Sequence, residues 1–199
     1  SAASDVYKRQ PGVISEVIKG DREENADAFI IACFGDPGLE AAREVTDKPV
    51  IGIAQAAITA ARLMAPNFSI LYVLDKSQKI IENVLKLHNA EKECCSIKSI
   101  GLGVLESEDK ERLLKALTEK GRECVEQDGA ECILLGCAGY VQFAEKMTED
   151  LGILVLDGVV PAVKLCEAMV QMGVKIPKRT LCDFPGEKTI LGFNDLTKF

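Results

Sequence analysis

Short uninterrupted runs of apolar residues alternate along the chain with longer stretches in which apolar residues recur every three or four positions. A short apolar run is typical of a strand buried on both faces, and the wider spacing is typical of an amphipathic helix. The runs predict strands at 28–32, 50–53, 68–74, 97–104, 132–135 and 153–156. The spaced patterns predict helices at 13–19, 38–44, 55–64, 78–88, 109–126, 143–151 and 161–172. Because strands and helices alternate, we expect an α/β fold built on parallel sheets with helices on both faces.

An internal repeat divides this pattern into two similar parts. Residues 26–35 (ADAFIIACFG) align without gaps on residues 130–139 (AECILLGCAG), and residues 49–53 align on 153–157 at the same offset. In each copy, a buried strand ends in Cys-x-Gly and is followed by a helix, a second strand and another helix. We therefore expect two pseudo-symmetric α/β halves with a cleft between them, in which the active site would lie.

The repeat also sets the expected domain boundaries. The first half would comprise residues 11–66 and the C-terminal helix at 160–175, and the second half residues 67–159. Residues 176–199 are expected to form an irregular tail. Residues 1–10 match no element of either half, and we interpret them as a non-native leader, so that the start of the first half would be missing.

Composition and charge exclude several classes of function. The net charge of −7 gives no electrostatic support for nucleic-acid binding, and no apolar run approaches the roughly 20 residues of a membrane-spanning helix. Because no signal-peptide pattern is present, we expect a cytoplasmic protein whose eight cysteines are mostly free thiols. The single histidine, His88, is expected at the surface or edge of a helix. Without a Cys-x-x-Cys motif, a metal site has no signature, and we expect none.

Cys33 and Cys137 are the candidate catalytic residues, because both follow buried strands where ligands bind in parallel α/β sheets. Gly35 and Gly139 follow two residues later and would let the backbone approach a ligand closely. Backbone N–H groups at each turn are expected to lower the thiol pKa. Two thiols facing each other across a cleft suit the inversion of a carbon next to a carbonyl, in which one face loses a proton and the other gains one. Two buried core thiols are the alternative interpretation from the residues alone.

Two segments carry a resemblance to a known family. Asp27 to Leu39 (DAFIIACFGDPGL) and Leu135 to Gly139 (LGCAG) resemble the hydantoin racemase branch of the aspartate/glutamate racemase superfamily, which includes allantoin racemases. Asp157-Gly158 and the helix after it fit the same pattern. The family usually opens with a strand ending in Asn-Pro-Asn, which has no counterpart in this chain. The resemblance implies cofactor-independent racemisation of 5-substituted hydantoins, with one cysteine serving each enantiomer, in a homo-oligomer.

The site expected from this resemblance extends to the neighbours of the two cysteines. Backbone N–H groups there are candidates to stabilise an enolate. The expected substrate-binding residues are Phe34, Gly35, Asp36, Gly136, Ala138 and Gly139. Gln55, where the branch often has Glu, and Asp157 are weaker candidates that would act through these residues. The alternatives are racemisation of allantoin or of aspartate or glutamate, a maleate-type isomerisation, and a non-catalytic or inactive fragment of the same fold.

Overall fold

The computed structural model describes residues 7–101 and 109–186, and within these ranges six strands form two parallel sheets. The smaller sheet pairs β1 (Phe29–Ile31) with β2 (Val50–Gly52). The larger sheet has the order β4-β3-β5-β6. Its strands are β3 (Phe68–Tyr72), β4 (Cys94–Ser99), β5 (Cys132–Leu135) and β6 (Leu154–Leu156). All four pairings are parallel, as the alternation of strands and helices predicts.

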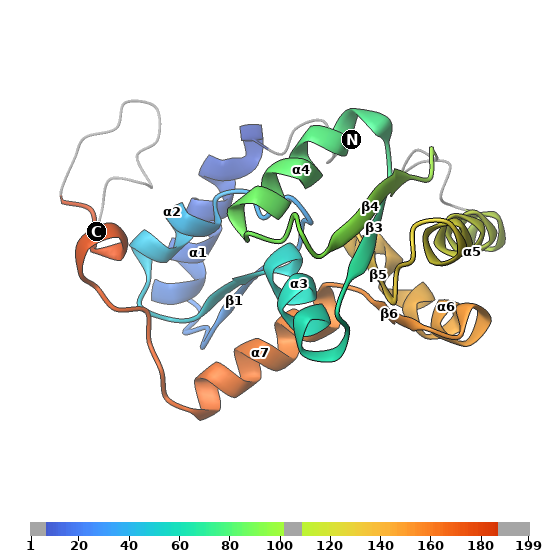
Figure 1. The fold of residues 1–199 in the computed structure, drawn as a ribbon. Coiled ribbons are helices and arrows are strands. Elements are labelled where there is room, and N and C mark those ends of the chain that lie inside the picture. The colour runs from blue at the N-terminus through green and yellow to red at the C-terminus, as the bar shows by residue number, and fades with distance from the viewer. Residues whose placement is uncertain (1–6, 102–108, 187–199) are drawn as a thin grey trace.

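Helices cover both sheets (Figure 1). The α-helices are α1 (Gln10–Arg22), α2 (Leu39–Val45), α3 (Ile53–Met64), α4 (Gln78–Leu87), α5 (Lys110–Glu126), α6 (Ala144–Leu151) and α7 (Val159–Gln171). Short 3-10 helices occupy Tyr7–Arg9, Asp75–Ser77, Ala138–Phe143 and Thr180–Cys182. No helix in the described ranges is both long enough and apolar enough to pass through a bilayer.

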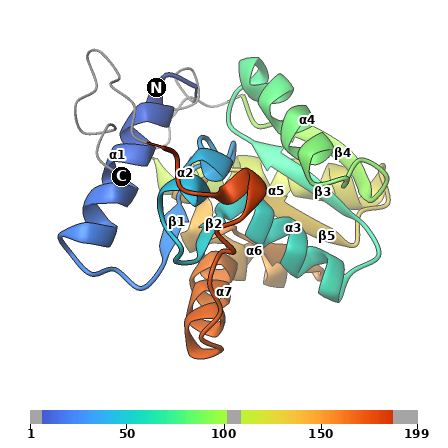
Figure 2. The same cartoon turned by 90° about the vertical axis from the view of Figure 1, so that its left-hand side faces the viewer.

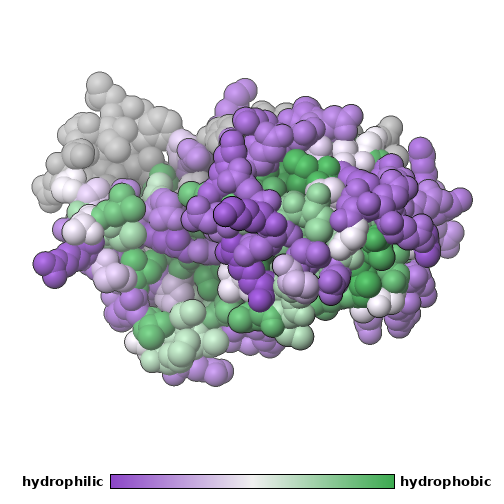
Figure 3. Space-filling view, in the orientation of Figure 1, coloured by the Kyte–Doolittle hydropathy of each residue, from purple (hydrophilic) through white to green (hydrophobic). Residues whose placement is uncertain are grey.

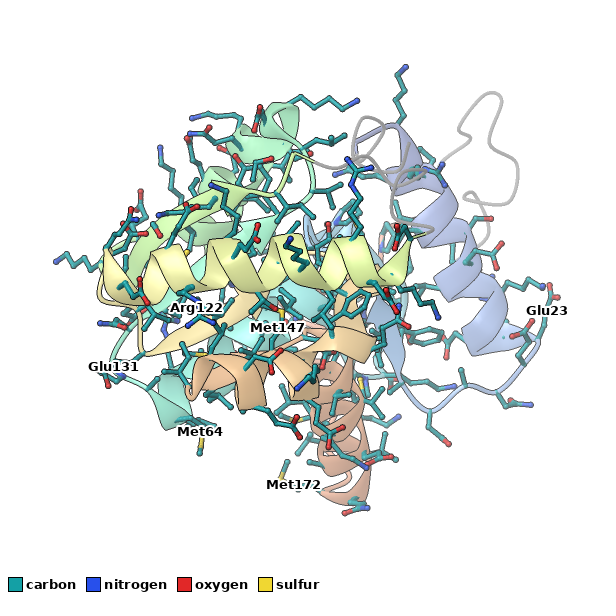
Figure 4. All side chains as sticks on the ribbon, turned by 90° about the vertical axis from the view of Figure 1, so that its right-hand side faces the viewer. Glu23, Met64, Arg122, Glu131, Met147 and Met172 are labelled. Atoms are coloured by element: carbon teal, nitrogen blue, oxygen red, sulfur yellow. The ribbon has the colours of Figure 1, made fainter. Side chains whose placement is uncertain are left out.

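The apolar faces of these elements form the core in three clusters. One cluster joins α1 and α2 to the smaller sheet (Figure 2). A second joins α5 and α6 to one face of the larger sheet, and Figure 4 shows Met147 of α6 beneath α5. The third joins α3, α4 and α7 to the opposite face of the larger sheet and also includes Ile51 of β2. The helix α3 contacts strands of both sheets, and α7 contacts both strands of the smaller sheet and packs on α3, so these two helices fix the sheets relative to each other.

Two elements differ by three or more residues from the expected bounds. The helix expected at 13–19 is longer, because Pro11 lies in the first turn of α1, where a missing N–H costs nothing. The strand expected at 97–104 begins earlier, at Cys94, and ends at Ser99, while its expected residues 102–104 lie outside the described ranges. The strand β4 lies at the edge of its sheet, and its mixed sequence CCSIKS is only partly buried, so its apolar signal is weak.

The segment after α7 is irregular and returns along α2. Ile176 donates its backbone N–H to the carbonyl of Asp47. Lys178 Nζ donates to the carbonyls of Arg43 and Glu44 at the end of α2. On the surface, apolar side chains remain exposed along and just after α7, in the lower part of Figure 3. They belong to Val160, Val163, Val170, Met172 and Val174.

Candidate active site

Cys33 and Cys137 occupy matching positions at the carboxyl ends of strands in the two sheets. Each cysteine lies two residues after the last residue of its strand, β1 for Cys33 and β5 for Cys137. Each is a free thiol of intermediate exposure. The turn after Cys33 is closed by a backbone hydrogen bond from Asp36 N–H to the carbonyl of Cys33, and the turn after Cys137 by one from Tyr140 N–H to the carbonyl of Cys137. The local geometry therefore repeats as the sequence does.

The same backbone group contacts each sulfur. The backbone N–H of Gly35 hydrogen-bonds to the thiolate of Cys33 and lowers its pKa, and Gly139 does the same for Cys137. A Cβ on Gly139 would lie 3.7 Å from the Cys137 sulfur, which shows how closely the backbone passes. Gly35 and Gly139 are thus thiolate hydrogen-bond donors in both turns.

The net pKa shifts have the opposite sign from the one expected from these N–H groups. Burial raises the pKa of the Cys33 thiol, and the negative charge of Asp36 raises it further. The positive charge of Arg9 opposes this rise. Burial also raises the pKa of the Cys137 thiol, more than the Gly139 N–H lowers it. The expectation of lowered pKa values was wrong, because removing water from a thiolate costs more than one backbone donor restores.

The two thiols interact electrostatically although they belong to different sheets. A negative charge on Cys33 raises the pKa of Cys137. Since like charges disfavour each other at short range, one thiolate favours the protonated form of the other thiol.

Asp36 is buried, and its carboxylate is directed at the start of α3. The backbone N–H groups of Ala54 and Gln55 donate to Oδ1 and Oδ2 at 3.0 and 2.8 Å. Asp36 has φ of +42°, a conformation that is uncommon for a residue other than glycine. A Cβ on Gly52 would collide with the Asp36 carboxylate, so only glycine admits this contact. The Asp36 side chain therefore fastens the turn that carries Cys33 to the start of α3.

The two weaker candidates lie at helix starts on either side of this region. Asp157 Oδ1 accepts the backbone N–H groups of Val159 and Val160 at the start of α7, at 2.6 and 2.9 Å. Gln55 Oε1 accepts a hydrogen bond from Arg43 Nη2 at 2.8 Å. The Gln55 side chain lines a groove of about 410 Å³ between α2, α3 and the segment after α7.

A second cavity borders Cys33. It measures about 630 Å³ and lies between α1 and β1, with Arg9, Glu16 and Pro37 also in its wall. Cys137 lies outside this wall. The N–H of Gly136 is already used within the sheet region, where it donates to the carbonyl of Leu71 at 2.7 Å.

Sequence reasoning missed three residues near the cysteines. His88, expected at the surface or edge, has a side chain that is 13% exposed, and its Nε2 lies 3.7 Å from Asp36 Oδ2, a contact that was not expected. Tyr140 is buried beside Cys137, where burial and the charge on that cysteine raise the Tyr140 pKa. Tyr140 could have been found by extending the repeat one residue, since it aligns with Asp36. Arg9 lies in the segment that was interpreted as a leader, and the contact of His88 has no local sequence signal.

No group of three or more His, Cys, Asp or Glu side chains in residues 7–101 and 109–186 could hold a metal ion. The described residues at and near the two turns offer two thiols, backbone N–H groups, Tyr140 and Arg9.

Comparisons with known proteins agree with this fold. The family model described as Asp/Glu/Hydantoin racemase matches residues 1–166. A hydantoin racemase of Pseudomonas sp. (strain NS671) is 44% identical over 189 residues, which cover 94% of this chain and 76% of that protein. A hydantoin racemase of Paenarthrobacter aurescens is 41% identical over 180 residues, covering 90% of this chain and 76% of that one. The structure of an allantoin racemase from Klebsiella pneumoniae superposes with a TM-score of 0.93 at 36% identity, over 98% of this chain and 80% of that one. The expected α/β racemase fold is confirmed.

Proposed function

Because the chain belongs to the Asp/Glu/hydantoin racemase family and is an isomerase of the racemase type, we propose that it racemises 5-substituted hydantoins without a cofactor. In this proposal Cys33 and Cys137 are the two catalytic residues, one on each face of the ring. The observation that carries it is the matched placement of the two thiols, each two residues after the end of a strand and two residues before a glycine.

The proposed reaction moves one proton in and one proton out. The thiolate of one cysteine removes the proton from the ring carbon next to the carbonyl, the C–H electron pair becomes the C=C bond of an enolate, and the carbonyl π pair moves to oxygen. The thiol of the other cysteine then donates its proton to the opposite face: the C=C pair forms the new C–H bond, the carbonyl re-forms, and the S–H electron pair stays on sulfur. The carbon is inverted, and the acid and base have exchanged roles, ready for the other enantiomer.

The neighbouring residues would bind the ring and stabilise the enolate. We assign the Gly35 and Gly139 N–H groups to the thiolates, and we propose the Phe34 and Ala138 N–H groups as donors to the enolate oxygen. The ring proton is already acidified by the adjacent carbonyl, so the two turns can supply what the reaction needs without a bound electron sink.

The remaining candidates have different proposed roles. Asp36 and Asp157 would hold the site in place without touching the substrate, since their carboxylates accept hydrogen bonds from the N–H groups at the starts of α3 and α7. Gly136 would bring the backbone of the second turn close to the substrate, and Gln55 would stabilise the Asp36 contact through its backbone N–H.

Single-enantiomer substrate in heavy water tests this proposal. Racemisation should deplete optical rotation and place deuterium on the ring carbon, followed by polarimetry and by mass spectrometry. Cys33→Ser and Cys137→Ser should each lose racemisation by about 10²–10⁴-fold, the usual contribution of a general acid or base. Cys95→Ser is the matched control, because Cys95 is an exposed free thiol on the edge strand β4. Full racemisation by both single variants would refute the two-cysteine mechanism.

Allantoin is the second candidate substrate, favoured by the similarity to the Klebsiella pneumoniae protein. A panel containing an alkyl hydantoin, an aryl hydantoin, allantoin, aspartate, glutamate and maleate separates these activities by their relative kcat/KM. Preference for allantoin would change the substrate and leave the roles of the two cysteines as proposed. Turnover of aspartate or glutamate alone would overturn the hydantoin assignment.

We also propose that the protein is a homo-oligomer and that it is located in the cytoplasm. A homo-oligomer would cover the apolar side chains exposed along α7, and light scattering at several protein concentrations would measure its mass. A cytoplasmic location is expected from the free thiols and is tested by fractionation of the cells that produce the protein.

A further inference from the structure

His88 joins a helix of the larger sheet to the turn that carries Cys33. The residue follows α4, which connects β3 to β4 in the larger sheet. Its Nε2 lies 3.7 Å from Oδ2 of Asp36, whose side chain has no exposed surface. Through this contact, the end of α4 in the larger sheet's half touches the turn that carries Cys33. The larger sheet also contains β5, which precedes Cys137.

Asp36 transmits this contact to Cys33. Its carboxylate is held by the N–H groups of Ala54 and Gln55, and its own backbone N–H donates to the carbonyl of Cys33 at 2.9 Å. Only Gly35, the donor to the Cys33 thiolate, and Phe34 lie between the two residues. A shift of the carboxylate would therefore move the turn and change the direction of the Cys33 sulfur.

The environment of His88 indicates why this contact matters. Its Nε2 is buried and has no hydrogen-bond partner in the described part of the chain. The distance of 3.7 Å to Asp36 Oδ2 lies beyond a hydrogen bond but within the range of an ion pair. The Asp36 carboxylate is thus a polar group that lies next to the buried Nε2 in the described part of the chain.

We infer that His88 is a positioning residue for Cys33, acting through Asp36, and not for Cys137. The inference rests on the proposed two-cysteine mechanism. Loss of the His88 contact should slow proton transfer at Cys33 and leave proton transfer at Cys137 nearly unchanged.

This asymmetry has a measurable signature. When Cys137 deprotonates one enantiomer, Cys33 must protonate the enolate to complete inversion. If Cys33 is misplaced, the enolate waits longer, and Cys137 returns a deuteron to the same face after its thiol has exchanged with heavy water. Deuterium then accumulates in the recovered starting enantiomer. For the opposite enantiomer, Cys33 removes the proton and Cys137 protonates the enolate. Because Cys137 is not displaced, the recovered opposite enantiomer should show no such increase in deuterium.

The experiment compares His88→Leu, His88→Gln and the matched control Lys86→Leu, which replaces an exposed residue in the last turn of α4. Each variant receives each pure hydantoin enantiomer in heavy water, and the ratio of exchange to inversion is measured. Cys33→Ser identifies the enantiomer that Cys137 deprotonates, because only that enantiomer should still exchange. For that enantiomer, His88→Leu should raise the ratio roughly threefold or more, the scale of a lost coupling between neighbouring residues.

The conservative variant separates positioning from folding. Gln places an amide nitrogen near the position of Nε2, so His88→Gln should restore most of the wild-type ratio. A general loss of structure would lower activity without changing the ratio for one enantiomer alone. If His88→Leu does not fold, His88→Asn replaces it in the comparison, because the shorter amide cannot reach the carboxylate.

A measurement without substrate supports the assignment independently. Alkylation of the free enzyme by iodoacetamide, followed peptide by peptide, should show a changed rate at Cys33 in His88→Leu and an unchanged rate at Cys137. Equal changes at both cysteines, or a ratio that changes for neither or both enantiomers, would overturn the role of His88. If the wild-type protein places no deuterium on the ring carbon, or if both Cys→Ser variants still racemise the substrate, the proposed function itself is refuted.

Discussion

Replacing Gly52 with Ala tests how firmly the Cys33 turn is fastened to α3. Gly52 has φ of −86° and ψ of 146°, which alanine adopts without strain, so the backbone itself should tolerate the change. The new Cβ would collide with the carboxylate of Asp36 and displace it from the N–H groups of Ala54 and Gln55. A hydrogen bond to a charged group contributes about 1.5–3 kcal/mol, and loss of a helix cap costs about 0.5–2 kcal/mol. We expect a loss of about 3 kcal/mol of unfolding free energy.

The assay is urea or thermal unfolding followed by circular dichroism. For a chain of this size, about 3 kcal/mol corresponds to a fall in Tm of about 6–12 °C. Gly12→Ala is the matched control, since a Cβ there meets nothing within 4 Å and α1 should gain up to about 1 kcal/mol from the better helix former.

A double-mutant cycle identifies the atom that Gly52 avoids. Asp36→Gly removes the carboxylate and also relieves the positive φ of residue 36. In that background, Gly52→Ala should cost no more than about 0.5 kcal/mol, the usual effect of a substitution that removes no specific contact. If Gly52→Ala costs as much in the Asp36→Gly background as in the wild type, the collision with the carboxylate is not its cause, and the reasoning fails.

Four further predictions follow from the thiols and from the segment after α7. Burial raises the pKa of both candidate catalytic thiols, so kcat/KM should keep rising with pH beyond about 8.5. A plateau of kcat/KM below about pH 7.5 would contradict this prediction. Above about pH 8.5 the unfolded chain releases thiol protons that buried thiols retain, so urea unfolding should show stability falling as the pH rises. Lys178→Met removes the donor to the last carbonyls of α2 and should cost about 2 kcal/mol, whereas Lys175→Met, which breaks an exposed ion pair, should cost about 0–1 kcal/mol. Iodoacetamide should alkylate exposed Cys95 first, while Cys132, fully buried and with its pKa raised to about 12, should react only after unfolding, as peptide mass spectrometry can measure.

The fold could be predicted from the sequence where burial is complete on both faces. The strand β5 contains only apolar residues and cysteine, and every residue is buried, so its run in the sequence marks it clearly. The edge strand β4 is only partly covered, and its polar and apolar residues mix, so its beginning was misplaced by three residues. A periodic pattern reports burial, and an element with little burial leaves little pattern.

The candidate site could be predicted only as far as the internal repeat reaches. The repeat selects Cys33 and Cys137 from eight cysteines, and the structure gives both the same relation to a following glycine. The contact of Asp36 with α3 spans 18 residues and that with His88 spans 52, so neither leaves a local motif. The sign of the thiol pKa shifts depends on burial in the folded chain, which a motif does not contain.

The two turns differ in how freely their sequences can change. Asp36 belongs to the turn of Cys33 and also caps α3, so one short segment serves both the proposed chemistry and the folding of a central helix. In the other half, the N–H groups at the start of α7 donate to Asp157, which follows β6 and lies outside the turn of Cys137. Mutations at the exposed positions after Cys137, Val141 and Gln142, should therefore cost little stability, whereas Tyr140 and Phe143 of the same turn are buried in the core and mutations at Asp36 break a fold contact. We expect libraries for new substrate range, and natural divergence, to find more folded variants at residues 141 and 142 than at 34–38.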